Sequence, residues 1–227
     1  MALWTIGDLH LAHSTDKPMD VFGERWRDHD IKIKTDWLAR VSPEDTVVIP
    51  GDISWGINLN EACDDLFFLS ELPGKKILLK GNHDYWWETV TKMQKFLEEK
   101  KLQNIYFLQN NHYLYDNFAI CGTRGWSLEG DNLQKMIARE TQRLELSLAD
   151  APAEKEKIVF LHYPPIYQDD VCFPMIEVMQ KYGVKRCYYG HLHGISVKNA
   201  VIGEHYGINF LIVSADSLDF CLHNILK

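Results

Sequence analysis

Five short apolar runs in this chain of 227 residues each end in side chains of the types that bind metal ions. The runs end at Asp8 and His10, at Asp52, at Asn82 to Asp84, at His162, and at His191 and His193. The strand ends of one α/β sheet lie side by side, and ligands bind in the crevice outside them. We therefore expect the five runs to be strands of an α/β fold whose ends form a single site.

Hydrophobic periodicity predicts alternating strands and helices along the first half of the chain. Strands are expected at 2–7, 46–50 and 76–80, and helices at 23–41, 59–71 and 86–101. Further strands are expected at 104–108, 112–116, 118–122, 157–161 and 186–190, and helices at 131–149 and 173–182. The tail, at 195–203, 206–213 and 217–223, has the pattern of antiparallel hairpins. The pattern predicts two mixed sheets, parallel early and antiparallel late, packed face to face with helices outside.

The composition indicates one domain, residues 1–227, because the chain shows no repeat and no clear linker. A hydrophobic content of 46% is enough for a substantial core. The five cysteines are scattered and form no CxxC motif, which is typical of reduced thiols. No signal peptide is evident, and no apolar run approaches the ~20 residues that a membrane helix needs. We expect a cytoplasmic protein without a membrane partner, in an oligomeric state that the sequence leaves open.

Spacing within the motifs is consistent with metal binding. Alternate residues of an extended chain point to the same side, so Asp8 and His10 can share one ion. Asn82 offers a hard, neutral oxygen ligand. The next residue, His83, would point elsewhere, and Asp84 could hold its ring by a hydrogen bond.

Each motif taken alone also has a structural interpretation. Asp8 and His10 could form a solvated loop pair, and Asp52 could cap a helix or form a turn. A lone histidine at a strand end is more often structural than a ligand. Half of the ten histidines fall in the five motifs, however, and this coincidence favours one shared site.

The complete set of motifs resembles the calcineurin-like metallophosphoesterase superfamily. The set stands here as Asp8-Leu9-His10, Gly51-Asp52, Gly81-Asn82-His83-Asp84, His162 and Gly190-His191-Leu192-His193. The resemblance implies a four-layer α-β-β-α sandwich with two mixed sheets. It implies one metal ion on Asp8, His10, Asp52 and His193, and a second on Asp52, Asn82, His162 and His191. Asp52 would then bridge the two ions.

The resemblance also implies a phosphohydrolase that cleaves a small phosphomonoester or phosphodiester by attack of a metal-bridging hydroxide. His83 would protonate the leaving group or steady the phosphoryl oxygens, with Asp84 beside it as a second expected catalytic residue. The sequence departs from the family in one place. Many members carry a second aspartate shortly after the bridging one, where this chain has Ile53-Ser54-Trp55. What supports that loop is therefore in question.

Charge balance is consistent with a phosphate ester as substrate. Two divalent ions bring four positive charges and the carboxylates of Asp8 and Asp52 bring two negative ones, so the centre keeps about +2. A phosphate ester supplies the missing negative charge. Oxygen and imidazole ligands favour Mn²⁺, Fe or Zn²⁺ over an all-oxygen Mg²⁺ site. The sequence predicts two divalent ions without identifying the metal.

A small phosphorylated molecule is the expected substrate. Arg124 could clamp its phosphate, although a structural ion pair is an equal alternative. Aromatic residues follow strand ends at Trp55, Trp86, Trp87, Trp126, Tyr163 and Tyr167. Core packing explains most of them, and an aromatic wall for a base or another flat leaving group is the alternative.

Two other functions remain open, a catalytically silent scaffold on the same fold and a nuclease. Intact ligand residues and His83 argue against the scaffold. The net charge of −8 argues against a nuclease and against a nucleic-acid partner, because phosphate backbones are bound by basic surfaces.

Overall fold

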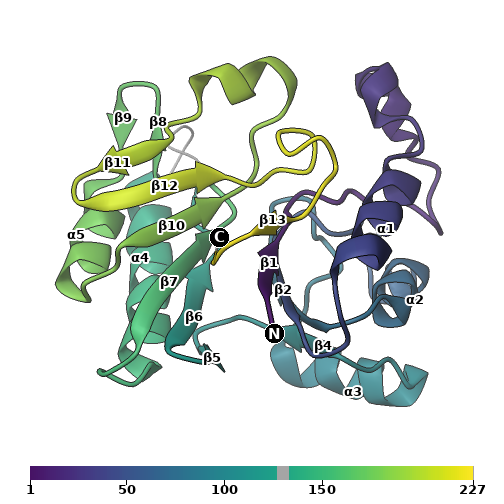
Figure 1. The fold of residues 1–227 in the computed structure, drawn as a ribbon, viewed down its shortest axis with the longest axis horizontal. Helices are drawn as coiled ribbons and strands as arrows, with labels where there is room; N and C mark the ends of the chain where they lie inside the picture. Colours follow the sequence, from purple (N-terminus) through teal and green to yellow (C-terminus); the bar gives the residue numbers. More distant parts are fainter. Residues whose placement is uncertain (127–132, 227) are drawn as a thin grey trace.

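The computed structural model describes residues 1–126 and 133–226, which form two sheets that face each other with helices on both outer sides (Figure 1). This arrangement confirms the predicted α/β fold with two mixed sheets flanked by helices. The layers follow one another as helices, sheet, sheet and helices across the view of Figure 1.

The first sheet has the strand order β13-β1-β2-β3-β4. Four of its strands are parallel: β1 (Leu3–Thr5), β2 (Thr46–Pro50), β3 (Lys75–Leu79) and β4 (Ile105–Phe107). The short β13 (His223–Asn224) pairs antiparallel with β1. Helices α1 (His29–Arg40), α2 (Cys63–Glu71) and α3 (Val90–Lys100) cover its outer face (Figure 1).

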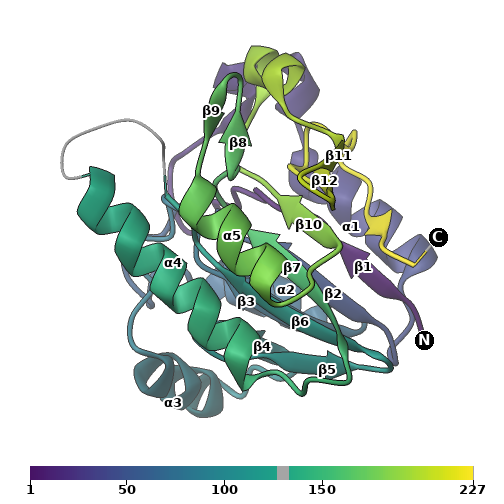
Figure 2. The same cartoon turned by 90° about the vertical axis from the view of Figure 1, so that its left-hand side faces the viewer.

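The second sheet has the strand order β11-β12-β10-β7-β6-β5. Its parallel centre consists of β6 (Phe118–Thr123), β7 (Glu156–Leu161), β10 (Arg186–Tyr189) and β12 (Ile208–Ile212). The strands β5 (Tyr113–Tyr115) and β11 (Gly203–His205) pair antiparallel at its two edges. Helices α4 (Leu133–Asp150) and α5 (Phe173–Lys181) lie across its outer face (Figure 2).

Alternation along each central strand separates the core into layers. In β2, Val48 packs between the two sheets, whereas Val47 and Ile49 pack against the helices outside the first sheet. The layer between the sheets also includes Ile77 and Phe160. Because these strands are buried on both faces, their sequences are continuous apolar runs without alternating polar residues. Among the described residues, none of the helices combines the length and the apolarity needed to span a bilayer.

Three expectations were wrong in the tail and in the pairing. The segment 195–203 begins as a 3-10 helix, η3 (Gly194–Asn199), rather than as a strand. Within 217–223, the strand pairing is confined to its last residue, which belongs to β13. The sheets are not parallel early and antiparallel late, because each has a parallel centre with antiparallel edges. Alternation identifies a strand but not its partner, which depends on distant segments.

The helix expected at 23–41 is interrupted at its start. Gly23 has φ 123° and Asp28 has φ 54°, so the chain forms two short 3-10 helices before α1, η1 (Met19–Phe22) and η2 (Glu24–Trp26). A hairpin of β8 (Ile166–Tyr167) and β9 (Asp170–Val171) had no predicted counterpart. The start of the helix expected at 131–149 lies partly outside the described residues.

His13 joins the loop after β1 to two helices. Its ring Nδ1 lies 2.8 Å from Oδ1 of Asp65 in α2, and its Nε2 lies 3.2 Å from Oδ2 of Asp30 in α1. The second oxygen of Asp65 accepts a hydrogen bond from the Ser54 hydroxyl. One charged ring and one carboxylate thus tie the loops after β1 and β2 to the helices outside.

We expect His13→Asn to destabilise the protein in a pH-dependent way. Hydrogen bonds to Asp30 and Asp65 raise the pKa of His13 from 6.5 to about 9. The protonated ring therefore stabilises the fold fully below about pH 6.5, and this contribution is lost as the pH rises through about 9. Urea denaturation of both proteins across this range measures the difference in free energy of unfolding.

Asp30→Asn provides a matched comparison, because it removes only one of the two carboxylates that face His13. The pH at which the stabilisation by His13 is lost should then be lower than in the unaltered protein. A difference between the unaltered protein and His13→Asn that stays constant with pH would contradict this account.

Candidate metal centre

The loops after β1 and β2 run side by side at the edge where both strands end. The N–H of Asp8 donates to the carbonyl oxygen of Gly51 at 2.9 Å, and that of His10 donates to the carbonyl oxygen of Asp52 at 2.9 Å. Asp8, His10 and Asp52 adopt φ values of 57°, 46° and 50°. Left-handed backbone is uncommon for residues other than glycine and persists where the surroundings impose it, often at functional sites.

Two motif glycines lie against the carboxylates of this edge. A Cβ on Gly81 would lie 2.1 Å from Oδ1 of Asp52, and a Cβ on Gly190 would lie 2.3 Å from Oδ2 of Asp8. Both distances are far below van der Waals contact. The loops therefore reach the two carboxylates only because these positions lack a side chain.

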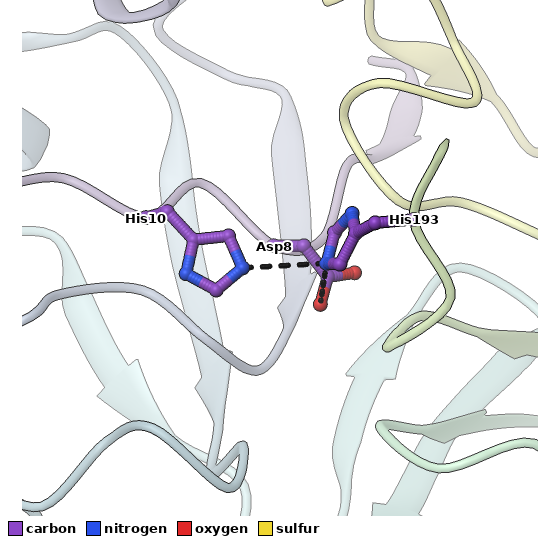
Figure 3. Close-up of side chains that lie close together, drawn as sticks. All are labelled: Asp8, His10 and His193. Atoms are coloured by element: carbon purple, nitrogen blue, oxygen red, sulfur yellow. Dashed lines mark hydrogen bonds and ion pairs between the residues drawn. The ribbon is translucent and has the colours of Figure 1, made fainter. Parts of the chain in front are cut away.

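Asp8, His10 and His193 form the first group of possible metal ligands (Figure 3). The Nε2 atom of His193 lies 3.5 Å from Oδ1 of Asp8 and 3.3 Å from Nε2 of His10. Each residue offers one ligand atom, and these atoms lie within 4.8 Å of one another. The two rings and the carboxylate come from the ends of β1 and β10, one strand in each sheet.

Asp52, His162 and His191 form the second group, again with ligand atoms within 4.8 Å of one another. The Nε2 atom of His162 lies 3.5 Å from Oδ2 of Asp52 and 2.6 Å from Oδ1 of Asn82. The same Oδ2 of Asp52 lies 3.8 Å from Nε2 of His10 in the first group. The Asp52 carboxylate thus lies between the two groups.

Burial and neighbouring charges shift the pKa values of the two carboxylates in opposite directions. Asp8 is 0% exposed and Asp52 is 2% exposed. Burial and the charge of Asp8 raise the pKa of Asp52 to about 8. Burial also opposes ionisation of Asp8, but contact with His193 outweighs it and holds the Asp8 pKa below its usual range. Among the described residues, no lysine or arginine pairs with either carboxylate, so bound cations would supply the compensating charge.

Burial also keeps most of the imidazoles neutral, as metal ligands must be. It lowers the pKa of His10 and His162, and burial together with the charge of His162 lowers the pKa of His191 to about 3. His193 differs. Burial lowers its pKa, but contacts with Asp216 and Asp8 outweigh burial and raise it to about 10.

The outer nitrogens of two rings have fixed partners. The Nδ1 atom of His193 lies 2.8 Å from Oδ1 of Asp216, whose Oδ2 accepts the N–H of Gly194 at 2.9 Å. The Nδ1 atom of His162 lies 3.1 Å from the carbonyl oxygen of Pro50. Metal-binding histidines usually have such a partner on the ring nitrogen away from the metal. Asp216 follows β12, a further apolar run ending in an acidic residue, and the sequence suggests it as a possible outer group of the site together with His13 and Asp16.

His83 lies beside the second group, and its backbone N–H donates to Oδ1 of Asp52 at 2.8 Å. Its ring Nε2 lies 4.0 Å from Oδ2 of Asp52. The expected bond from Asp84 to this ring is absent among the described residues, and the Nδ1 atom of His83 has no partner there. Burial and the charge of His162 lower the pKa of His83.

The Asp84 carboxylate faces the protein interior instead. It accepts N–H groups from Ile53, Ser54, Gly81 and the indole of Trp86 at 2.7–3.2 Å. Successive residues of the turn point to different sides, and the carboxylate is satisfied by the backbone donors on its own side. Burial and the charge of Asp52 raise its pKa to about 6. Asp84 and Asp65 thus support the loop that lacks the family's second aspartate.

Arg124 lies next to the site through its backbone. Its carbonyl oxygen accepts the N–H groups of His162 and Tyr163 at 3.1 and 2.9 Å. Its guanidinium lies over the ring of Trp126 and 3.9 Å from Oε1 of the buried Glu140. This contact matches the structural ion-pair alternative, and phosphate binding by Arg124 stays a prediction. Trp86 and Trp87 pack in the core, as expected for most of the aromatic residues.

Known proteins resemble this chain in sequence over a short stretch and in structure over nearly its whole length. The chain is 35% identical to the Gene 66 protein of Mycobacterium phage L5 over 81 residues, 36% of this chain and 39% of that protein. It is 39% identical to the Gene 66 protein of Mycobacterium phage D29 over 83 residues, 36% of this chain and 40% of that protein. These matches span about two fifths of the phage proteins.

A solved structure of a protein of unknown function from Aquifex aeolicus superposes with a TM-score of 0.54 at 18% identity. The superposition covers 98% of this chain and 95% of the other, and shows that the two share a fold. Residues 1–194, which include the ligand groups on both sheets, match the family described as calcineurin-like phosphoesterase. The chain therefore belongs to the calcineurin-like phosphoesterase family.

Proposed function

We propose that the protein hydrolyses small phosphomonoesters or phosphodiesters with the help of two divalent metal ions. The observation that carries this proposal is the pair of ligand groups, Asp8-His10-His193 and Asp52-His162-His191, with the Asp52 carboxylate between them. Asn82 joins the second group through its side-chain oxygen. Seven side chains make two sets of four only if one residue is shared, and we propose Asp52 as that residue because its carboxylate lies near His10 of the first group and His162 of the second.

The donor atoms suit divalent ions of intermediate hardness. Carboxylate oxygens, one amide oxygen and four imidazoles favour Mn²⁺, Fe or Zn²⁺. When bound, a pair of such ions lowers the pKa of a coordinated water and offsets the negative charge that develops at phosphorus. The chain itself holds the ligands in place through Asp216, the Pro50 carbonyl and the Asp84 carboxylate.

His83 is proposed as the group that acts on the leaving oxygen of the ester. Its ring is half-buried, lies beside Asp52, and is not needed to complete either set of four ligands. A histidine in this position can donate a proton to the leaving group or a hydrogen bond to the phosphoryl oxygens. Asp84 supports the loop that carries His83, so we propose a positioning role for it.

A small phosphorylated substrate and a cytoplasmic location belong to the same proposal. The intact ligand set argues against a silent scaffold, and the net charge of −8 argues against nucleic acid as substrate. The discriminating observation is turnover. A protein that binds two ions but cleaves neither a chromogenic phosphomonoester nor the matching diester would be a scaffold.

We expect about two ions per chain after Mn²⁺ reconstitution, and fewer with much lower turnover in Asp52→Ala. Removal of a shared carboxylate weakens both sets of ligands, and loss of one electrostatic contact in a reacting centre lowers kcat by about 10²–10³-fold. Elemental analysis and the two ester assays measure both effects. Asp169→Ala, at an exposed aspartate, is the control. Near-normal turnover and metal content in Asp52→Ala would refute the shared ligand.

His83→Asn should retain both ions but lose roughly 10²–10⁴-fold in rate, the range for a general acid. The loss should shrink for nitrophenyl esters, because a nitrophenolate leaves without protonation. Rates for esters of differing leaving-group basicity test this, with His205→Asn on the exposed β11 as a control. Equal losses for all esters would assign a role in steadying the phosphoryl oxygens, and an unchanged rate would remove His83 from the reaction.

A further inference from the structure

An apolar cavity of about 260 Å³ opens directly beside the metal centre. Its lining combines three imidazoles of the site with apolar side chains from the segment before α1 and from the loop after β2. The lining residues are His10, Met19, Phe22, Trp26, Trp55, His83, His193 and Gly194. The segment 19–26, drawn in purple in Figure 1, contributes Met19, Phe22 and Trp26 to this lining, and the start of η3 contributes Gly194.

Two indoles form the walls next to the imidazoles. Trp55 stacks on His10 with ring centroids 5.0 Å apart and an interplanar angle of 24°. Trp26 stands at 68° to the same ring, so the two indoles meet at an angle and do not form a parallel slot. The N–H of the Trp55 indole donates to the sulfur of Met19 at 3.3 Å. With its polar atom bound in this way, Trp55 offers the cavity an apolar surface.

Phe22 distinguishes this cavity from ordinary core packing. Its side chain is 66% exposed, while Met19 and Trp26 in the same short segment are buried. Phe22 lines the mouth of the cavity, where an apolar ligand would cover its ring. The neighbouring Val21 is also exposed but does not line the cavity. Phe22 is therefore assigned to the mouth of the cavity by its position and not by its exposure alone.

We propose that this cavity binds a compact apolar group, aryl or short alkyl, on the alcohol side of the phosphoester. The inference rests on the proposed function and specifies its substrate class. The phosphoryl group carries the negative charge and belongs at the metal centre, so the substituent on the ester oxygen extends from there. The cavity begins at His10, His83 and His193, and His83 therefore lies where the phosphoryl and apolar parts of such a substrate meet.

The shape of the cavity argues for a compact group. Its volume of about 260 Å³ is below the roughly 300–1,000 Å³ of pockets that enclose whole drug-sized ligands. The angled indoles can contact one face and one edge of a ring but cannot sandwich a flat base. A polar sugar would lose its hydration against these apolar walls without gaining equivalent hydrogen bonds.

Binding of non-hydrolysable phosphonates to the Mn²⁺-loaded full-length protein tests the inference by calorimetry. Phenylphosphonate and butylphosphonate should each bind at least about tenfold more tightly than methylphosphonate, because the additional carbons become buried. The phenyl and butyl arms distinguish an aryl from an alkyl preference. Phe22→Ala should lower the ratio of phenyl to methyl affinity by about threefold or more.

Val21→Ala is the matched control, because it removes an exposed apolar side chain from the same segment but not from the cavity. It should keep the affinity ratio of the unaltered protein. Equal binding of methyl- and phenylphosphonate, or an equal loss in both variants, would overturn the inference while the proposed function stands. Failure of the metal-loaded protein to bind any phosphonate would also overturn the inference, and the two ester assays would then test the proposed function separately.

Discussion

The structure depends on the burial of two carboxylates, Asp8 and Asp52, where two sheets meet. Both are almost inaccessible to solvent, and their contacts of opposite charge among the described residues are with histidines. Buried like charges are costly unless cations or hydrogen bonds compensate them. Burial and the charge of Asp8 accordingly raise the pKa of Asp52. Divalent ions held by the two ligand groups would compensate both charges and keep both carboxylates ionised.

A second set of acidic residues forms hydrogen bonds to the loops that carry the ligands. Asp84, Asp65 and Asp216 follow strands or lie in adjoining helices, and each accepts hydrogen bonds from a loop that carries a ligand. Asp84 and Asp65 bind Ile53 and Ser54, directly after the left-handed turn at Asp52, and Asp216 binds His193 and Gly194. The missing second aspartate of the family therefore does not leave the Asp52 loop unsupported. Asp84 and Asp65, which follow this loop in the sequence, accept hydrogen bonds from its residues Ile53 and Ser54.

The sequence was sufficient to predict the layers and a single site at the ends of the five apolar runs. The strand ends of one parallel sheet lie at one edge, but three of these runs belong to the first sheet and two to the second. The expectation of one common sheet was therefore wrong, and the two ligand groups form where the two sheets face each other. The sequence was insufficient where the answer depends on distant partners. Pairing of β12 parallel to β10 is set by the crossover between them, which local alternation does not encode. The bond expected between Asp84 and His83 fails for a similar reason, since donors from the Asp52 loop already satisfy the Asp84 carboxylate.

The interruption of the helix expected at 23–41 affects the surroundings of the two ligand groups. Trp26 is buried in the same core cluster as Ile33 and Trp37. With the turns at Gly23 and Asp28 on either side of its short 3-10 helix, its ring also lies 5.5 Å from the ring of His193. The same turns leave Phe22 exposed at the mouth of the cavity. Departures from local propensity are expected where a site needs them. This one adds an apolar wall to a centre whose other features, its ligands and their charges, are polar.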